Sequence, residues 1–127
     1  MFDKPAVRVV MTTSANVVEL NGEIAQHLER IEELLDSDIS TRLDTKFLIG
    51  IHFQKIKSAL YFLGLMLCAP KGRFKSIYEQ TQLTKSQVYL YMKMNEHLKS
   101  IKNHFGAWSY PSDNQLQRFV ESLENQQ

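Results

Sequence analysis

One stretch of the chain, residues 72–98, has the sequence GRFKSIYEQTQLTKSQVYLYMKMNEHL. Its apolar residues fall into two short runs with helical spacing, and a polar turn separates the runs. Thr84 followed three residues later by Gln87 forms a capping box, which marks the start of the second helix. Two short helices joined by a tight turn are typical of a helix-turn-helix, and proteins with that motif most often bind DNA. This stretch is therefore the basis for predicting both the fold and the function.

The two predicted helices cover about residues 73–81 and 85–101. Their apolar side chains have the spacing needed to pack the helices against each other at a steep angle. The expected inward positions are Phe74, Ile77, Tyr78, Leu83, Val88, Tyr91 and Met92. The expected outward positions near the start of the second helix are Lys85, Ser86, Tyr89, Leu90 and Lys93.

These outward positions provide the candidate DNA contacts. Residues near the start of a recognition helix reach base edges, where lysine suits guanine, serine suits several edges and an apolar group suits the thymine methyl. We therefore predict base contacts by Lys85, Ser86 and Tyr89, with Leu90 as a methyl contact. The predicted phosphate contacts, which position the protein without reading sequence, are Lys71, Arg73, Lys75, Thr84, Gln87 and Lys93. The alternative for each of these side chains is an ordinary solvated surface position.

A long helix is expected before the motif, over about residues 42–67. Thr41 and Asp44 form a second capping box at its start. The helix becomes apolar nearly all round toward its end, so we expect that end to form the core. Gly50 and Gly64 inside it cost helix propensity but allow close contacts with other helices.

Two amphipathic helices are expected at the ends of the domain. Residues 16–36 carry apolar residues at three- and four-residue steps, and residues 112–123 do the same after a capping box of Ser112 and Gln115. Either helix, or both, could form a homodimer, and packing within the chain is the alternative. Residues 1–15 have strand propensity at 7–10 but no partner strand, so we expect a flexible arm or one exchanged between subunits.

Composition and charge limit the possible classes. At 127 residues the chain is long enough for one domain, here 16–127, and its single cysteine, Cys68, fits a reducing cytoplasm. Residues 47–105 hold nine Lys/Arg and two Asp/Glu, whereas residues 1–46 hold five Lys/Arg and nine Asp/Glu. Such a basic segment suits a phosphate-facing surface. No secretory signal is evident, and the longest apolar run is too short for a membrane span.

Several residues around the turn also match a known motif, namely Gly72-Arg73-Phe74, Leu83-Thr84, Val88 and Tyr91-Met92. With them, the segment from about Ile56 to Leu98 resembles a bacterial, phage and plasmid helix-turn-helix family. In that family a long apolar helix leads into a Gly-x-Phe/Trp start, and a Ser/Thr-capped recognition helix ends in Tyr-Met. The resemblance implies an all-helical DNA-binding domain of regulatory or mobile-element proteins.

Two residues depart from the family pattern. Gln82 occupies the turn position usually held by glycine, so it must adopt a conformation that glycine prefers. Tyr78 occupies a position between the helices that is usually alanine. With so bulky a residue there, either the helices cross more widely or the segment is a helical hairpin without a role in DNA binding.

No residue pattern indicates catalysis or a cofactor. The four histidines are far apart in sequence and lack metal-ligand spacing, and the chain has neither a Walker loop nor a nucleophile elbow. We therefore expect a sequence-specific double-stranded DNA-binding protein, a homodimeric transcriptional regulator of a bacterial, plasmid or phage system. The alternatives are a non-catalytic protein-interaction module of the antirepressor or phage-inhibitor type, and a DNA-packaging or partition adaptor.

Overall fold

The structure is a computed structural model that describes the backbone of residues 5–67 and 73–126 and the side chains of residues 17–64 and 73–126. Over these residues the fold is all-helical, as the sequence predicts. The elements in order are α1 (Pro5–Asp36), α2 (Leu43–Leu67), α3 (Arg73–Glu79), α4 (Lys85–Met94), a 3₁₀ turn η1 (Asn95–His97), α5 (Leu98–Phe105) and α6 (Asp113–Asn125). Within this part of the chain, no helix combines the length and the apolarity needed to cross a bilayer.

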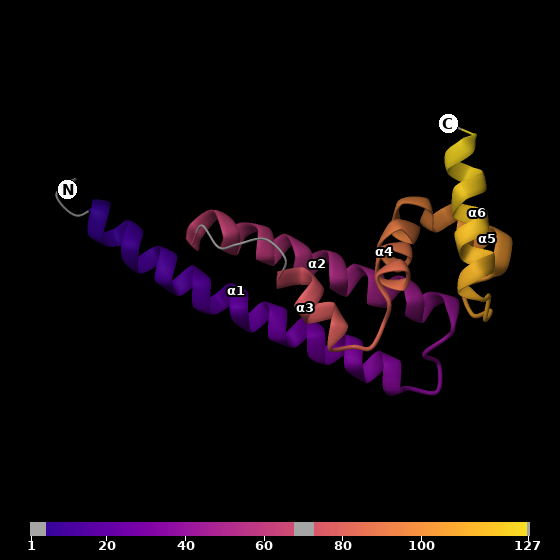
Figure 1. The fold of residues 1–127 in the computed structure, drawn as a ribbon, viewed down its shortest axis with the longest axis horizontal. Coiled ribbons are helices and arrows are strands. Elements are labelled where there is room, and N and C mark those ends of the chain that lie inside the picture. The colour runs from indigo at the N-terminus through magenta and orange to yellow at the C-terminus, as the bar shows by residue number, and fades with distance from the viewer. Residues whose placement is uncertain (1–4, 68–72, 127) are drawn as a thin grey trace.

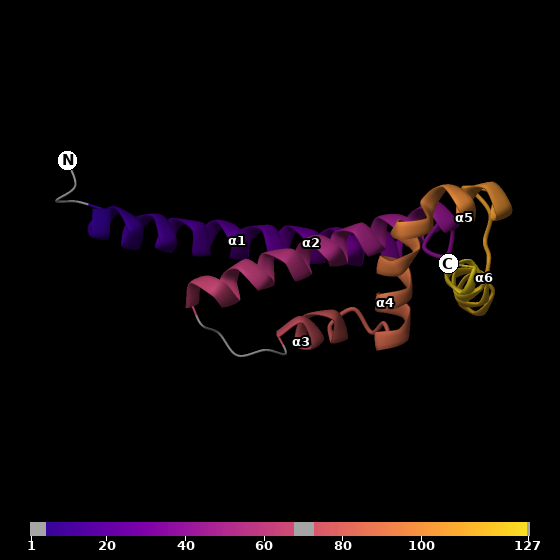
Figure 2. The same ribbon diagram turned by 90° about the horizontal axis from the view of Figure 1, so that it is seen from above.

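The long helices α1 and α2 lie side by side in opposite directions, α3 and α4 lie against one side of α2, and α5 and α6 lie beyond α4 near the start of α2 (Figures 1 and 2). The apolar stripe expected on residues 16–36 is buried against α2, with Ile31 fully buried and Ile24 and Leu34 nearly so. Because α1 is amphipathic, burying this stripe removes apolar surface from water and leaves the glutamates exposed.

Helix α1 begins at Pro5, well before the predicted start at residue 16. The expected arm over residues 1–15 is therefore helical from Pro5 onward, and only residues 1–4 of it lie outside the described residues. Strand propensity at residues 7–10 does not decide the local structure, because a strand needs a partner and the described chain offers none. Extending a helix that already exists costs little, since nucleation is the expensive step.

The start of α2 differs from the predicted capping box. Asp44 accepts two hydrogen bonds from the Arg42 guanidinium, at 2.6 and 2.8 Å, and it has no bond to Thr41. The backbone amides of Leu43 and Asp44 donate instead to carbonyl oxygens in the 106–111 loop, at 2.8 and 3.0 Å. The first amides of α2 are thus satisfied by a distant loop, which a local pattern cannot reveal.

The core extends along α2 from Leu43 to Leu63, so the prediction that it lies at the apolar end of this helix holds only in part. Ala59 and Leu63 in that end are 4% and 1% exposed, but Tyr61 and Phe62 between them are 65% and 51% exposed. Helices α4, α5 and α6 lie near the first half of α2, and α3 lies beside its middle (Figure 1). The core around α2 consists of Leu43, Phe47, Ile49, Phe53, Ile56, Ala59 and Leu63.

Gly50 is the point where α2 and α4 approach most tightly. A Cβ atom there would run into the backbone carbonyl of Tyr91 and would lie 2.9 Å from the Asn95 side-chain nitrogen. The expected close contact at this glycine is therefore present. At Gly64, by contrast, a Cβ would meet nothing within 4 Å.

The predicted helix 85–101 is divided in two. Helix α4 ends at Met94, and the 3₁₀ turn η1 redirects the chain into α5. The last helix agrees with its prediction, because Ser112 and Gln115 form both bonds of the capping box at the start of α6. Its apolar residues Leu116 and Val120 are 0% and 2% exposed.

Candidate nucleic-acid interface

The turn between α3 and α4 has the backbone conformation that the sequence requires. Gln82 has φ +65°, in the left-handed region where glycine is usual. The Thr81 hydroxyl donates to the Tyr78 carbonyl at 2.6 Å and accepts from the Leu83 amide at 3.3 Å. These bonds hold the turn, and α3 and α4 leave it at a steep angle to each other (Figure 2).

The inward positions are largely placed as predicted. Tyr78 is only 5% exposed and packs edge to face on Phe74, with ring centroids 5.4 Å apart. The bulky residue is therefore accommodated between the helices. Ile77, Val88, Tyr91 and Met92 are buried, and Phe74 and Leu83 are half-buried.

The capping box at the start of α4 is confirmed. The Thr84 hydroxyl accepts from the Gln87 amide at 3.2 Å, and the Gln87 side-chain oxygen accepts from the Thr84 amide at 3.0 Å. The Gln87 side-chain nitrogen donates to Asp113 on α6 at 3.0 Å. The Gln87 side chain is thus occupied within the protein, and a phosphate could reach only the exposed Thr84 edge of this cap.

Three of the four predicted base contacts are at the surface. Lys85 and Ser86 are exposed, and Tyr89 is 38% exposed. Leu90 is only 5% exposed and belongs to the core, so its prediction as a thymine-methyl contact is wrong. Successive side chains of a helix are rotated by about 100° around its axis. Leu90 follows the exposed Tyr89, and this rotation points it toward the interior.

The predicted phosphate contacts fall into two groups. Arg73 and Lys75 on α3 are exposed, whereas Lys71 lies outside the described residues. Lys93 is paired with Glu124 at 2.9 Å and with Glu96 at 3.4 Å, and these carboxylates raise its pKa. Because two carboxylates already surround its ammonium group, Lys93 is a poor phosphate contact.

Helix α2 supplies a cation that sequence reasoning missed. The Lys57 ammonium lies 4.9 Å from the centroid of the Tyr89 ring and 5.7 Å from that of Phe74. The Lys85 ammonium lies 5.9 Å from the same Tyr89 ring, and the rings of Phe74 and Tyr89 meet edge to face at 6.1 Å. We call Lys57, Phe74, Lys85 and Tyr89 the basic–aromatic cluster. Position 57 in a long helix gave no signal of this role, because only the packing of α2 on the motif brings it there.

Asp113 joins the motif to the rest of the core. Its carboxylate accepts from the Lys46 ammonium at 2.7 Å, from the Tyr91 hydroxyl at 3.0 Å and from Gln87 at 3.0 Å. Burial raises the pKa of Asp113, but the bonds from Lys46, Gln87 and Tyr91 outweigh it and lower the pKa overall. Burial and the Asp113 charge raise the pKa of Tyr91. The ionised carboxylate therefore fixes α4 against α2 and α6.

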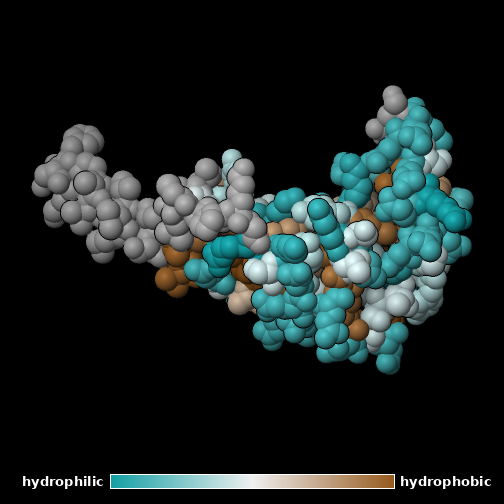
Figure 3. All heavy atoms as spheres, in the orientation of Figure 1, coloured by the Kyte–Doolittle hydropathy of each residue, from teal (hydrophilic) through white to brown (hydrophobic). Residues whose placement is uncertain are grey.

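Side chains of α4 and α6 line a groove of about 810 Å³. Leu90 and Val120 line it between the two helices, and its α6 wall is acidic. Figure 3 shows that the face of the molecule seen in Figure 1 is mostly hydrophilic, with scattered hydrophobic areas. The acidic wall consists of Asp113, Glu121 and Glu124, with Asn114 and Gln117 between them.

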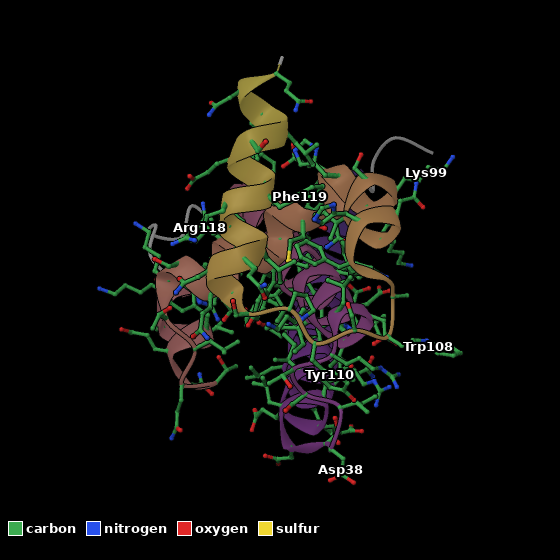
Figure 4. All side chains as sticks on the ribbon, turned by 90° about the vertical axis from the view of Figure 1, so that its right-hand side faces the viewer. Asp38, Lys99, Trp108, Tyr110, Arg118 and Phe119 are labelled. Atoms are coloured by element: carbon green, nitrogen blue, oxygen red, sulfur yellow. The ribbon has the colours of Figure 1, made fainter. Side chains whose placement is uncertain are left out.

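The 106–111 loop presents two aromatic side chains to solvent. Trp108 is 77% and Tyr110 58% exposed, and Figure 4 shows Trp108 pointing away from the helices. With so much of each ring exposed, neither residue caps a small core. The neighbouring Phe119 instead packs between α6 and α5, stacked on His104 with ring centroids 4.4 Å apart.

No protein-family model, curated protein or solved structure matches this chain. Among the described residues, no group of three or more histidine, cysteine and acidic side chains is arranged to hold a metal ion. The single cysteine, Cys68, lies outside the described residues.

Proposed function

We propose that the protein binds double-stranded DNA through α3, the turn and the start of α4. The observation that supports this proposal is a group of cations contributed by three helices around one helix start. Lys57 from α2, Lys85 from α4, and Arg73 and Lys75 from α3 are all exposed. Within the described part of the chain, none of the four forms an ion pair, so their charge is available to phosphates.

The start of α4 adds a second source of positive potential. The free amides and the helix dipole favour an anion at a helix N-terminus. Lys85 and Ser86 lie in the first turn of α4, where a recognition helix meets base edges. Tyr89, one turn further on, is fixed by contact with Phe74 and Lys57, so it presents a constrained edge to the DNA.

The acidic wall of the groove restricts where DNA can lie. Glu124 neutralises Lys93 in the last turn of α4, and Glu121 lines the same side. The carboxylates of this wall repel the negatively charged DNA phosphates. The duplex would therefore contact the first half of α4 and avoid the end of that helix. This arrangement narrows the predicted contacts to Arg73, Lys75, Lys85, Ser86 and Tyr89, with Lys57 added.

Salt-dependent binding tests the proposal. Fluorescence anisotropy with duplex DNA at two salt concentrations compares the wild type with Lys57→Ala/Lys75→Ala. Each lost phosphate contact lowers the log–log salt slope by about 0.9, so the double variant should lose about 1.8. The matched control is Lys99→Ala/Lys102→Ala, which removes the same charge from exposed positions on α5. Absence of binding at low salt, or equal weakening in both variants, would refute the proposal.

The proposed regulator would act as a homodimer in the cytoplasm of a bacterial, plasmid or phage system. The two helices predicted to dimerise, 16–36 and 112–123, bury their apolar stripes within the chain, as Ile31 and Leu116 show. A dimer would therefore use their outer faces, where Val18 is 72% exposed. Light scattering at two protein concentrations distinguishes a monomer, a dimer and the ring expected of a packaging or partition adaptor.

A protein-interaction module is the second candidate. The exposed Trp108 favours it, because tryptophan is enriched among the residues that dominate binding energy at protein interfaces. The groove between α4 and α6 offers an additional surface with charge of both signs. This function predicts a stoichiometric protein complex that survives nuclease treatment and is weakened by Trp108→Ala. If the protein binds DNA instead, Trp108→Ala should leave the affinity for DNA unchanged.

A further inference from the structure

Two histidines face each other across the interface between α1 and α2. His27 and His52 approach at 2.9 Å between their Nδ1 atoms, and their ring centroids are 5.1 Å apart. At this distance one nitrogen must donate a proton and the other must accept it with its lone pair. The contact is therefore attractive when at most one of the two rings is charged. A second proton would set two N–H groups against each other.

The surroundings oppose charging both rings. Both side chains are half-buried, and burial is the largest cause that lowers the pKa of each. Lys55 on α2 lowers the pKa of both rings, and Arg30 on α1 lowers that of His52. The negative charge of Glu23 on α1 raises the pKa of His27, which offsets part of this effect. The cations Arg30 and Lys55 also make the pair a poor site for a metal ion.

The pair is part of the apolar seam that joins the two longest helices. Ile24 and Ile31 on either side of His27 are 7% and 0% exposed, and both pack into the main core. His27 occupies a position of the α1 stripe where the neighbouring repeats carry apolar residues. Repulsion at this position would therefore act directly on the contact between α1 and α2.

We propose that His27 and His52 form a pH-sensitive latch, which holds α1 against α2 near neutral pH and loosens the pair when both imidazoles are protonated. Loosening exposes the apolar stripe of α1 that includes Ile24, Ile31 and Leu34. The latch lies on α1 and α2 and uses none of the residues proposed to contact DNA. It can therefore be tested whether or not the protein binds DNA.

The sign of the effect follows from proton linkage. Both histidines have a folded-state pKa below the ordinary value of 6.5. The unfolded chain thus binds more protons in this range, and stability rises with pH. The stabilisation is complete above the unfolded pKa and is lost as the pH falls below 6.5 through the folded pKa values.

The test compares the urea midpoint of unfolding at several pH values between 8 and 5. The variant His27→Gln/His52→Gln keeps hydrogen-bonding groups at both positions but cannot titrate, so its midpoint should fall less over this range than that of the wild type. The matched control His104→Gln removes an exposed histidine on α5 and should retain the wild-type slope.

Site-resolved NMR titration of the wild-type histidines provides a readout that does not depend on how well a variant folds. His27 and His52 should titrate in two separate steps below 6.5, and the protection of α1 amides from exchange, relative to the intrinsic rate at each pH, should fall over the same range. Equal slopes for the wild type and the double variant would overturn the latch. So would titration of both rings in a single step at the ordinary value.

Discussion

The close contact between Gly50 and α4 predicts that Gly50→Ala destabilises the protein. A Cβ atom at this position would lie 2.5 Å from the carbonyl carbon of Tyr91 and 2.9 Å from the side-chain nitrogen of Asn95. Favourable carbon contacts need about 3.5 Å or more, so α4 would have to move by roughly 1 Å. A backbone carbonyl cannot rotate away as a flexible side chain can. Asn95 also donates to the Phe47 and Tyr91 carbonyls, at 3.3 and 3.1 Å, and both bonds would be disturbed.

The magnitude combines three contributions. Overpacking costs about 3 kcal/mol at the upper end of its usual range, which suits a rigid obstacle. Weakening the Asn95 hydrogen bonds adds about 1 kcal/mol. Alanine is more favourable than glycine inside a helix by about 1 kcal/mol, which offsets part of the cost. We therefore expect Gly50→Ala to lower the free energy of unfolding by about 3 kcal/mol.

Urea unfolding followed by circular dichroism measures this change, and the melting temperature should fall by about 10 °C. Gly64→Ala is the matched control, because it lies in the same helix and its Cβ would meet nothing within 4 Å. It should stabilise the protein by about 0.5–1 kcal/mol through helix propensity alone. If Gly50→Ala is as stable as Gly64→Ala, then α2 and α4 do not pack as closely as described.

Three further predictions concern the core and the turn. Lys46→Met should cost about 2–4 kcal/mol in urea unfolding, because the ammonium is 2.7 Å from Asp113 and its loss leaves a partly buried carboxylate without its cation. Asp113 has a folded-state pKa below its ordinary value. Its contribution to the free energy of unfolding is therefore present above about pH 4 and is lost as the pH falls through the folded-state pKa. Asp113→Asn should therefore reduce the loss of stability in acid, measured as the unfolding midpoint between pH 5 and 2. Gln82→Gly should stabilise the protein by about 1 kcal/mol, because φ is +65° there and glycine adopts this conformation without strain. An unchanged or lower urea midpoint would show that Gln82 is not strained.

The turn was predictable in detail from the sequence. The capping box of Thr84 and Gln87, the left-handed Gln82 and the burial of Val88 and Tyr91 all agree with the structure. Each depends on residues within about four positions of one another, where hydrogen bonds and helical spacing act locally. A pattern of a few residues contains the information that decides such features.

The candidate site was predictable only in part. Leu90 is buried rather than exposed, and Lys93 is neutralised by Glu124 on α6. Lys57, which completes the basic–aromatic cluster, comes from a helix outside the motif. These outcomes depend on which face of α4 turns toward α2 and α6. Periodicity gives the faces of a helix but does not identify the neighbour that each face meets.

By itself, the sequence determined the all-helical class and the approximate extents of the helices around the turn, because capping and amphipathic spacing are encoded locally. Only the tertiary structure decided that the core extends along α2 from Leu43 to Leu63, that Gly50 contacts α4, and that His27 meets His52. These contacts join residues 25 or more positions apart, as between His27 and His52. They arise when long helices align to bury the most apolar surface, and that choice depends on the whole chain.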